Sequence, residues 1–341
     1  MILFGLILVT LFLIGLRNRN MSLFNKDIVT VLKPFLAFAI ILHHLCVYQD
    51  VSYLHEFERW GPLVVGMFFF ISGYGLSFNR LHNWGGGYLK GFITRNILKK
   101  LFLPTACAFI LNMFLNYHSN VYDIEKHLFN PSGMTFFPND WFIYALIFCY
   151  SIFYISNTFK ATAGRFTFQL ALLCLFVVFC AQNGWHRNWW ATPLAFLMGQ
   201  IYYTYEQKII GLIAGIKMYI FCNVVLSAFF ASLFVLGIVI GSHVSTAIVY
   251  STLPVWVVIC LTHIDLRTLA KNRIILFFGS ISFEIYLLHG IIMDFLRDNT
   301  VFRQTVFLFA TVALTVISAY VFRKIVSYIK MGLSKITSAQ V

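Results

Sequence analysis

Long apolar runs separated by short polar stretches make up almost the whole chain. Runs of roughly 17–25 apolar residues have the length that carries a helix across a bilayer core. Such runs lie at about residues 1–16, 29–48, 61–78, 97–117, 141–159, 166–182, 189–206, 217–240, 246–263, 274–295 and 303–326. The first is short, and 189–206 is the least apolar because it contains Thr192, Gln200 and Glu206. The pattern predicts an all-α polytopic membrane protein of about eleven transmembrane helices.

The distribution of basic residues predicts the orientation of these helices. If the N-terminus lies outside and the helices alternate in direction, all but five of the 25 lysines and arginines fall on the cytoplasmic side. The exceptions are Arg59, Lys126, Arg187, Arg297 and Arg303. Lysine and arginine accumulate in cytoplasmic loops, so we expect the N-terminus outside and the C-terminus in the cytoplasm. One helix more or fewer would move many of these basic residues to the outer side. The observed distribution therefore supports the count of eleven.

Composition agrees with a membrane protein. Of 341 residues, 60% are hydrophobic and 11% are charged, which is typical of helical membrane proteins. The net charge of +13 is explained by cytoplasmic loops beside anionic lipid headgroups, so no nucleic-acid partner is expected. The seven cysteines lie in or at the ends of apolar runs without a Cys-x-x-Cys pair, and we expect no metal site or disulfide framework.

The runs divide the chain into three parts. We expect an N-terminal transmembrane anchor over residues 1–20, a membrane domain over 27–326 and a basic cytoplasmic tail over 327–341. Residues 1–16 are similar to the core of a signal peptide but lack a basic start and an Ala-x-Ala site, so a cleaved segment is the alternative. The longest outside loop, 118–140, carries the turn signals Asn-Pro-Ser-Gly and Pro-Asn-Asp.

Lys33 and His44 are the strongest candidates for chemistry. They lie eleven positions apart in one apolar run, which on a helix places them on nearly the same face about 16 Å apart. Ionisable residues in membrane helices usually face a polar interior. A neutral His44 could take a proton from a hydroxyl nucleophile. Lys33 could instead extend to the inner interface, and His43 could form an ordinary interhelical hydrogen bond.

Other candidates surround this pair. Arg95, Lys99 and Lys100 are cytoplasmic cations, explained either by normal topology or by contact with the phosphates of a cytosolic donor. Ser72 and Gly73 are small residues within a helix, which favours close packing or a channel wall.

Two further runs carry polar or aromatic candidates. Glu284, Tyr286 and His289 lie in one apolar helix. Glu284 is expected near the headgroups, and His289 is deeper and therefore a functional candidate. Trp141 begins a helix after Pro138-Asn139-Asp140 and is expected in the interfacial aromatic belt, with a place in the substrate channel as the second interpretation.

Together these residues resemble the acyltransferase-3 family of integral membrane acyltransferases, which O-acetylate bacterial surface glycans and related acceptors. Four segments are similar in order over about residues 27–325: Lys33 with His44, Phe69 to Tyr74, the basic run Arg95, Lys99 and Lys100 before Pro104, and Ser282 to His289. The helix start at Trp141-Phe142 is similar to the sugar O-acetylase-like branch. The family often has arginine at the position of Lys33 and glycine at Pro34, so we expect the helix to begin later here.

The resemblance implies a ten-helix acyltransferase core preceded by one extra helix, in a bacterial cytoplasmic (inner) membrane. It implies acetyl-CoA, or another acyl-CoA, as the cytosolic donor, with its phosphates on Lys33, Arg95, Lys99 and Lys100. The acceptor would be a hydroxyl of a surface glycan or of its lipid-linked precursor. His44 would act as base or carry the acyl group transiently, with His289 as a second catalytic candidate.

Two other function classes remain open. Buried charge also marks transport pathways, so a glycan or lipid-linked saccharide transporter or flippase is the main alternative, although no internal repeat supports it. A glycan polymerase would be expected to have a large outside loop with several basic residues, and loop 118–140 has one lysine and no arginine.

Overall fold

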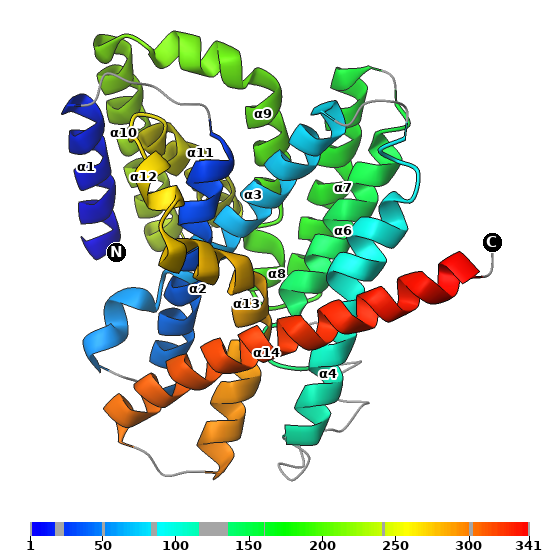
Figure 1. The fold of residues 1–341 in the computed structure, drawn as a ribbon. Helices are drawn as coiled ribbons and strands as arrows, with labels where there is room; N and C mark the ends of the chain where they lie inside the picture. Colours follow the sequence, from blue (N-terminus) through cyan, green and yellow to red (C-terminus); the bar gives the residue numbers. More distant parts are fainter. Residues whose placement is uncertain are drawn as a thin grey trace.

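A computed structural model describes residues 2–17, 24–49, 52–82, 87–115, 136–159, 161–240, 243–299 and 303–339. Regular structure in these ranges is entirely helical (Figure 1). The elements are α1 (Ile2–Arg17), α2 (Lys26–Gln49), the 3₁₀ helix η1 (Ser52–Phe57), α3 (Gly61–His82), the π-helix η2 (Ile93–Phe102), α4 (Leu103–Leu115), α6 (Trp141–Ser156), α7 (Thr162–Gln182), α8 (Asn188–Ala191), α9 (Leu194–Ile213), α10 (Ile216–Ile240), α11 (His243–Leu261), α12 (Arg267–Ala270), α13 (Arg273–Asn299) and α14 (Gln304–Ala339).

The helices confirm a polytopic membrane protein. Within the described ranges, eight helical segments are long and apolar enough to cross a bilayer, and Leu6–Leu16 and Trp141–Ser156 are shorter apolar helices. The weakest predicted run, 189–206, corresponds largely to α9. The count of eleven, the orientation and the three-part division stay predictions. Residues 116–135 of the long loop, which include Lys126, and Gly85 and Gly86 lie outside the described residues.

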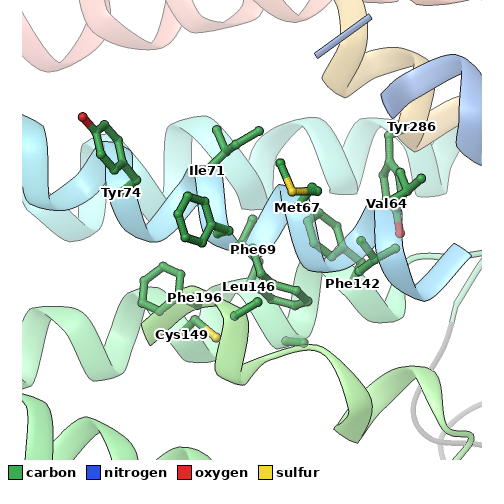
Figure 2. Close-up of a cluster of buried hydrophobic side chains, with 14 of the residues drawn as sticks. Val64, Met67, Phe69, Ile71, Tyr74, Phe142, Leu146, Cys149, Phe196 and Tyr286 are labelled. Atoms are coloured by element: carbon green, nitrogen blue, oxygen red, sulfur yellow. The ribbon is translucent and has the colours of Figure 1, made fainter. Parts of the chain in front are cut away.

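Close packing of α3 against α9 forms the centre of the molecule. A Cβ on Gly73 would collide with the Phe196 carbonyl oxygen, and one on Gly199 would collide with the Phe70 carbonyl oxygen. Small residues let helix backbones approach in this way, so Gly73 serves packing. Figure 2 shows the neighbouring core, where Phe69 and Phe142 meet edge to face with ring centroids 4.9 Å apart.

Helix α2 continues unbroken through Pro34, so the expectation of a later helix start is wrong. A proline inside a helix leaves the carbonyl four residues earlier without its usual donor. Here Gly279 of α13 packs against the Thr30 carbonyl and the Pro34 ring, with a Cβ position only 3.1 Å from that oxygen. The lack of a side chain on Gly279 lets α13 lie close along α2.

Helix α13 lies between α2 and α14, and the three share a core cluster that includes Ile41, Ile285 and Ala319. The long α14 crosses the other helices at a steep angle and continues to Ala339, through most of the predicted tail (Figure 1). Contact between α2 and α13 brings together two segments about 240 residues apart in sequence, each of which carries a histidine from the sequence prediction.

Candidate active site

A large cavity of about 1300 Å³ opens among α2, α3, α6, α7, α9, α13 and α14. Its wall joins segments far apart in the sequence, because Lys33 of α2 and residues of α14 face the same space. The cationic lining residues are Lys26, Lys33, Arg80, Lys100, Arg165, Arg323 and Lys330. The carboxylates in the wall are Glu206 and Glu284. The excess of positive charge fits an anionic ligand.

The structure brings together only part of the predicted basic cluster. Lys33 and Lys100 line the cavity. Arg95 and Lys99 are not among the lining residues, and Arg95 turns instead to Tyr88, donating to its carbonyl at 2.8 Å with the guanidinium 5.3 Å from the ring centroid. These residues lie on a π-helix, whose wider turn is a frequent feature of functional sites.

Arg323 and Lys330 were missed by the sequence analysis because cytoplasmic topology alone explained them. Their signal was spacing: Arg323, Val326, Ser327 and Lys330 all line the cavity, and such steps of three, four and seven select one helix face. The spacing of seven positions between Arg323 and Lys330 would have identified this face.

The two carboxylates of the cavity wall, Glu206 and Glu284, differ in their contacts. Glu206 accepts the Phe24 backbone N–H at 2.6 Å and the Tyr74 hydroxyl at 2.9 Å, so it fixes the chain before α2 to α3. Glu284 lies in the cavity wall, and its Oε2 has no hydrogen-bond partner among the described residues. Arg323 and Lys330 line the same cavity as Glu284, so the negative charge of this carboxylate partly offsets their positive charge.

Three imidazoles gather where α2 meets α13. The rings of His44 and His289 have centroids 5.0 Å apart, and those of His43 and His44 are 4.7 Å apart. His289 is completely buried. His43 donates from Nδ1 to the Phe57 carbonyl at 3.1 Å, because a carbonyl can only accept. This bond ties α2 to η1 and agrees with the structural interpretation of His43.

The tautomer of His289 follows from its hydrogen bonds. Nδ1 lies 2.6 Å from the Tyr286 carbonyl oxygen and must carry the proton. In the neutral ring, Nε2 then presents a lone pair, and the amide nitrogen of Asn139 lies 3.4 Å from it. The Tyr286 hydroxyl donates to the Asn139 carbonyl at 3.0 Å. Asn139 therefore contacts α13 through both its side chain and its backbone.

The turn that presents Asn139 is held by its neighbour Asp140. Asn139 has φ +68°, a left-handed conformation that asparagine tolerates better than most residues. Oδ2 of Asp140 accepts the backbone N–H groups of Phe136 at 2.7 Å and Phe137 at 3.2 Å, and the Tyr144 hydroxyl at 3.0 Å. Burial raises the pKa of Asp140 to about 7 despite these bonds. Sequence reasoning recognised Pro138-Asn139-Asp140 only as a turn.

The remaining candidates connect the cavity with the imidazoles. Ser72 and Tyr286 line the cavity, and the Tyr286 ring lies 5.7 Å from that of His289. Trp141 is 7% exposed and packs against Phe142 and Trp189, so its placement in the interfacial belt is wrong. It belongs to the protein interior beside the site.

Residues 27–324 match the protein family described as the acyltransferase domain, Acyl_transf_3. The chain belongs to the acyltransferase-3 family. It is therefore a membrane acyltransferase, as the order of its motifs predicted. No curated protein and no solved structure matches it.

An acyltransferase needs a place for its acyl donor and a group that moves a proton during transfer. In this acyltransferase-3 member, the cation-lined cavity and the His44–His289 pair are separate features joined through Tyr286. In the described part of the chain, no group of three histidine, cysteine or acidic residues is arranged to hold a metal ion.

Proposed function

We propose that this acyltransferase moves an acetyl group from cytosolic acetyl-CoA to a hydroxyl of a cell-surface glycan or of its lipid-linked precursor. The observation that carries the proposal is the single cavity that holds Lys33 and Lys100 and also includes Tyr286, the neighbour of His289. Acyl-CoA combines several phosphates with a long, thin arm that ends in the thioester. Such a ligand suits a large cationic cavity whose wall includes the tyrosine beside His289.

The donor phosphates rest against Lys33, Lys100, Arg323 and Lys330 in this proposal. Charge-assisted hydrogen bonds to phosphate are strong in a site with little water. From Lys33 to His44 the axis of α2 rises about 16 Å, a length that an extended arm carrying a thioester can follow. Arg95 and Lys99 do not line the cavity and remain available to lipid headgroups.

The transfer step uses His44 as general base. The acceptor O–H gives its proton to the His44 imidazole while the oxygen attacks the thioester carbonyl carbon. A tetrahedral intermediate forms, the C–S bond breaks, and the protonated imidazole returns its proton to the departing thiolate. His289 lies close enough to orient His44 or the acceptor hydroxyl through Nε2. A transient acyl group on His44 is the second route.

The proposal includes a topology: eleven spans with the N-terminus outside, in a bacterial cytoplasmic membrane. Lys33 then faces the cytosol, where acyl-CoA is made, and His44 lies toward the outer side. The acetyl group reaches a glycan beyond the membrane without passage of the whole coenzyme.

Purified protein with labelled acetyl-CoA and a glycan acceptor tests the function. We expect His44→Ala to abolish transfer and His289→Ala to reduce it strongly. His55→Ala is a matched control because His55 is exposed on η1 and does not line the cavity. Transfer by His44→Ala at the wild-type rate would exclude the proposed base.

Comparing surface glycans by mass spectrometry in cells with and without the gene would identify the acceptor. The family favours this reading over a transporter or flippase. Movement of saccharide across proteoliposomes in the absence of any acyl donor would reverse that preference.

A further inference from the structure

A second concavity lies at the opposite end of α7 from the donor cavity. It has a volume of about 450 Å³ and is lined by Trp185, Arg187, Trp190, His243 and Thr246. The large cavity takes Arg165 and Gln169 from the beginning of α7, whereas Ala181 near the end of the same helix lines the small one. The twelve steps along the helix from Gln169 to Ala181 correspond to a rise of about 18 Å.

The pocket is built by a rigid helix end. Gly184 has φ +68°, and its N–H bonds to the Ala181 carbonyl at 3.2 Å while the Trp185 N–H bonds to the Cys180 carbonyl at 2.9 Å. This pair of bonds is the Schellman motif, which needs a residue that accepts positive φ. It fixes the chain direction at Trp185, whose indole packs against Phe179 and Trp189.

The lining combines aromatic side chains with the positive charge of Arg187. Trp190 meets the His243 ring edge to face at 5.0 Å. Arg187 is exposed, no acidic residue lines the pocket, and no carboxylate forms a salt bridge with Arg187 among the residues that the structure describes. Indole faces carry partial negative charge that attracts the C–H groups of a sugar ring, and a guanidinium pairs with a carboxylate in a two-pronged geometry.

Ring contacts connect this pocket with the imidazole pair. Trp185 packs against Trp189 at 4.8 Å, and Trp189 packs against Trp141 at 6.1 Å. Trp141 follows directly after the turn in which Asn139 contacts His289. Arg187 also lies within electrostatic range of the His43 ring. A ligand in the pocket would therefore be linked to the imidazoles through this series of contacts and would lie at the opposite end of α7 from the donor cavity.

We infer that this pocket binds an acidic sugar unit of the acceptor, with the pyranose ring against Trp185 and Trp190 and its carboxylate on Arg187. The volume is in the range of small-molecule sites and accommodates one or two sugar rings. The inference rests on the proposed function for its meaning, because it names the class of acceptor. Sugar binding itself requires no acyl donor.

Saturation-transfer NMR on the full-length protein in nanodiscs tests the pocket, with glucuronic acid, glucose and glycerol 3-phosphate as separate probes. We expect transfer to the ring protons of glucuronic acid and weaker transfer to glucose. Arg187→Gln should weaken glucuronic acid binding about tenfold and leave glucose unchanged, whereas Trp185→Leu should weaken both. Arg303→Gln, a like change at an exposed residue before α14, should have no effect.

Two results would overturn the inference. Equal binding of glucuronic acid by wild type and Arg187→Gln would exclude the proposed contact between Arg187 and the sugar carboxylate. Competition by glycerol 3-phosphate as strong as that by glucuronic acid would identify the pocket as a lipid-headgroup site. Failure of the proposed function differs from both, because it would appear as absence of acetyl transfer by wild-type protein whose pocket still binds the sugar.

Discussion

The amide nitrogen of Asn139 lies 3.4 Å from Nε2 of His289, although 150 residues separate them in the chain. The same asparagine receives the Tyr286 hydroxyl on its carbonyl oxygen. The turn before α6 thus contacts two residues of α13, the imidazole of His289 and the hydroxyl of Tyr286 one turn earlier. This double contact makes Asn139 a positioning residue for the imidazole pair, and its two contributions can be separated by mutation.

Asn139→Gly is expected to lower acetyl transfer about fivefold while the melting temperature changes little. Glycine accepts the positive φ without strain and keeps the carbonyl for Tyr286, but it removes the amide beside His289, a contact with a typical net value of ~1 kcal/mol. Transfer rates and thermal unfolding in detergent measure the two effects. Asn139→Ala should lower both the transfer rate and the melting temperature, because alanine does not favour a positive φ. Equal rates for wild type and the glycine variant would show that the amide does not act on His289.

Gly290→Ala is expected to destabilise the protein by about 1–3 kcal/mol and to reduce transfer. A Cβ at this position would lie 2.7 Å from Pro138 Cβ and 2.8 Å from the Asn139 amide nitrogen, so the turn would have to move away from α13. Gly332→Ala is the control, because no atom lies within 4 Å of its Cβ position on α14. There alanine should be neutral or slightly stabilising. A Gly290→Ala protein as stable and active as wild type would mean that the turn adjusts freely.

Asp140 is expected to make stability depend on pH. Burial raises its pKa from 3.8 to about 7, so the folded protein holds the proton more tightly than the unfolded chain. Its contribution is full below about pH 4 and is lost as the pH rises toward 7. Asp140→Asn stays neutral, so its melting temperature should fall less than that of wild type between pH 4.5 and 7.5.

The control for that experiment is Asp265, whose pKa has the opposite shift. Hydrogen bonds from Arg267 lower the pKa of Asp265 to about 2, so its contribution is present at neutral pH and is lost only below about pH 4. Asp265→Asn should therefore show the same change in melting temperature between pH 5 and 7.5 as wild type. Identical pH curves for wild type and Asp140→Asn would contradict a neutral Asp140 carboxyl in the fold.

Lys100→Gln is expected to raise KM for acetyl-CoA about tenfold with little change in kcat. Lys100 faces the donor cavity, and loss of a charge-assisted bond to phosphate weakens binding in the ground state and the transition state alike. Lys99→Gln removes the same charge one position away, where the side chain does not line the cavity, and should leave KM within about twofold. Equal effects of both variants would indicate a general surface potential instead of a defined phosphate contact.

The periodicity of the sequence was enough to predict the helical membrane fold, because each span must satisfy its backbone internally whatever its neighbours are. It also identified Lys33, His44 and His289, since an ionisable residue in an apolar run stands out without any knowledge of packing. The His44–His289 contact itself could not be predicted, because it depends on how closely α13 approaches α2, and that approach rests on Gly279 beside Pro34.

Other residues were missed or misplaced for related reasons. Asn139 gave only the signal of a turn, since its value lies in a contact with a distant helix. Arg95 was grouped with Lys100 by proximity in sequence, yet the π-helix directs it to Tyr88. Trp141 begins an apolar helix, which is where interfacial tryptophans are expected, but in the fold Trp189 packs against it. In each case a tertiary neighbour decided the role of the residue.

The donor cavity draws its wall from α2 and from α14, whose lining residues lie about 290 positions apart in the sequence. Helices up to α13 can enter the membrane while the ribosome is still extending the chain, but Arg323 and Lys330 are synthesised only after α13. A chain that stops before α14 can therefore insert without completing its binding surface for an anionic donor. Catalytic competence is coupled in this way to the translation of α14, and chains that lack it should draw nothing from the cell's pool of activated acyl groups.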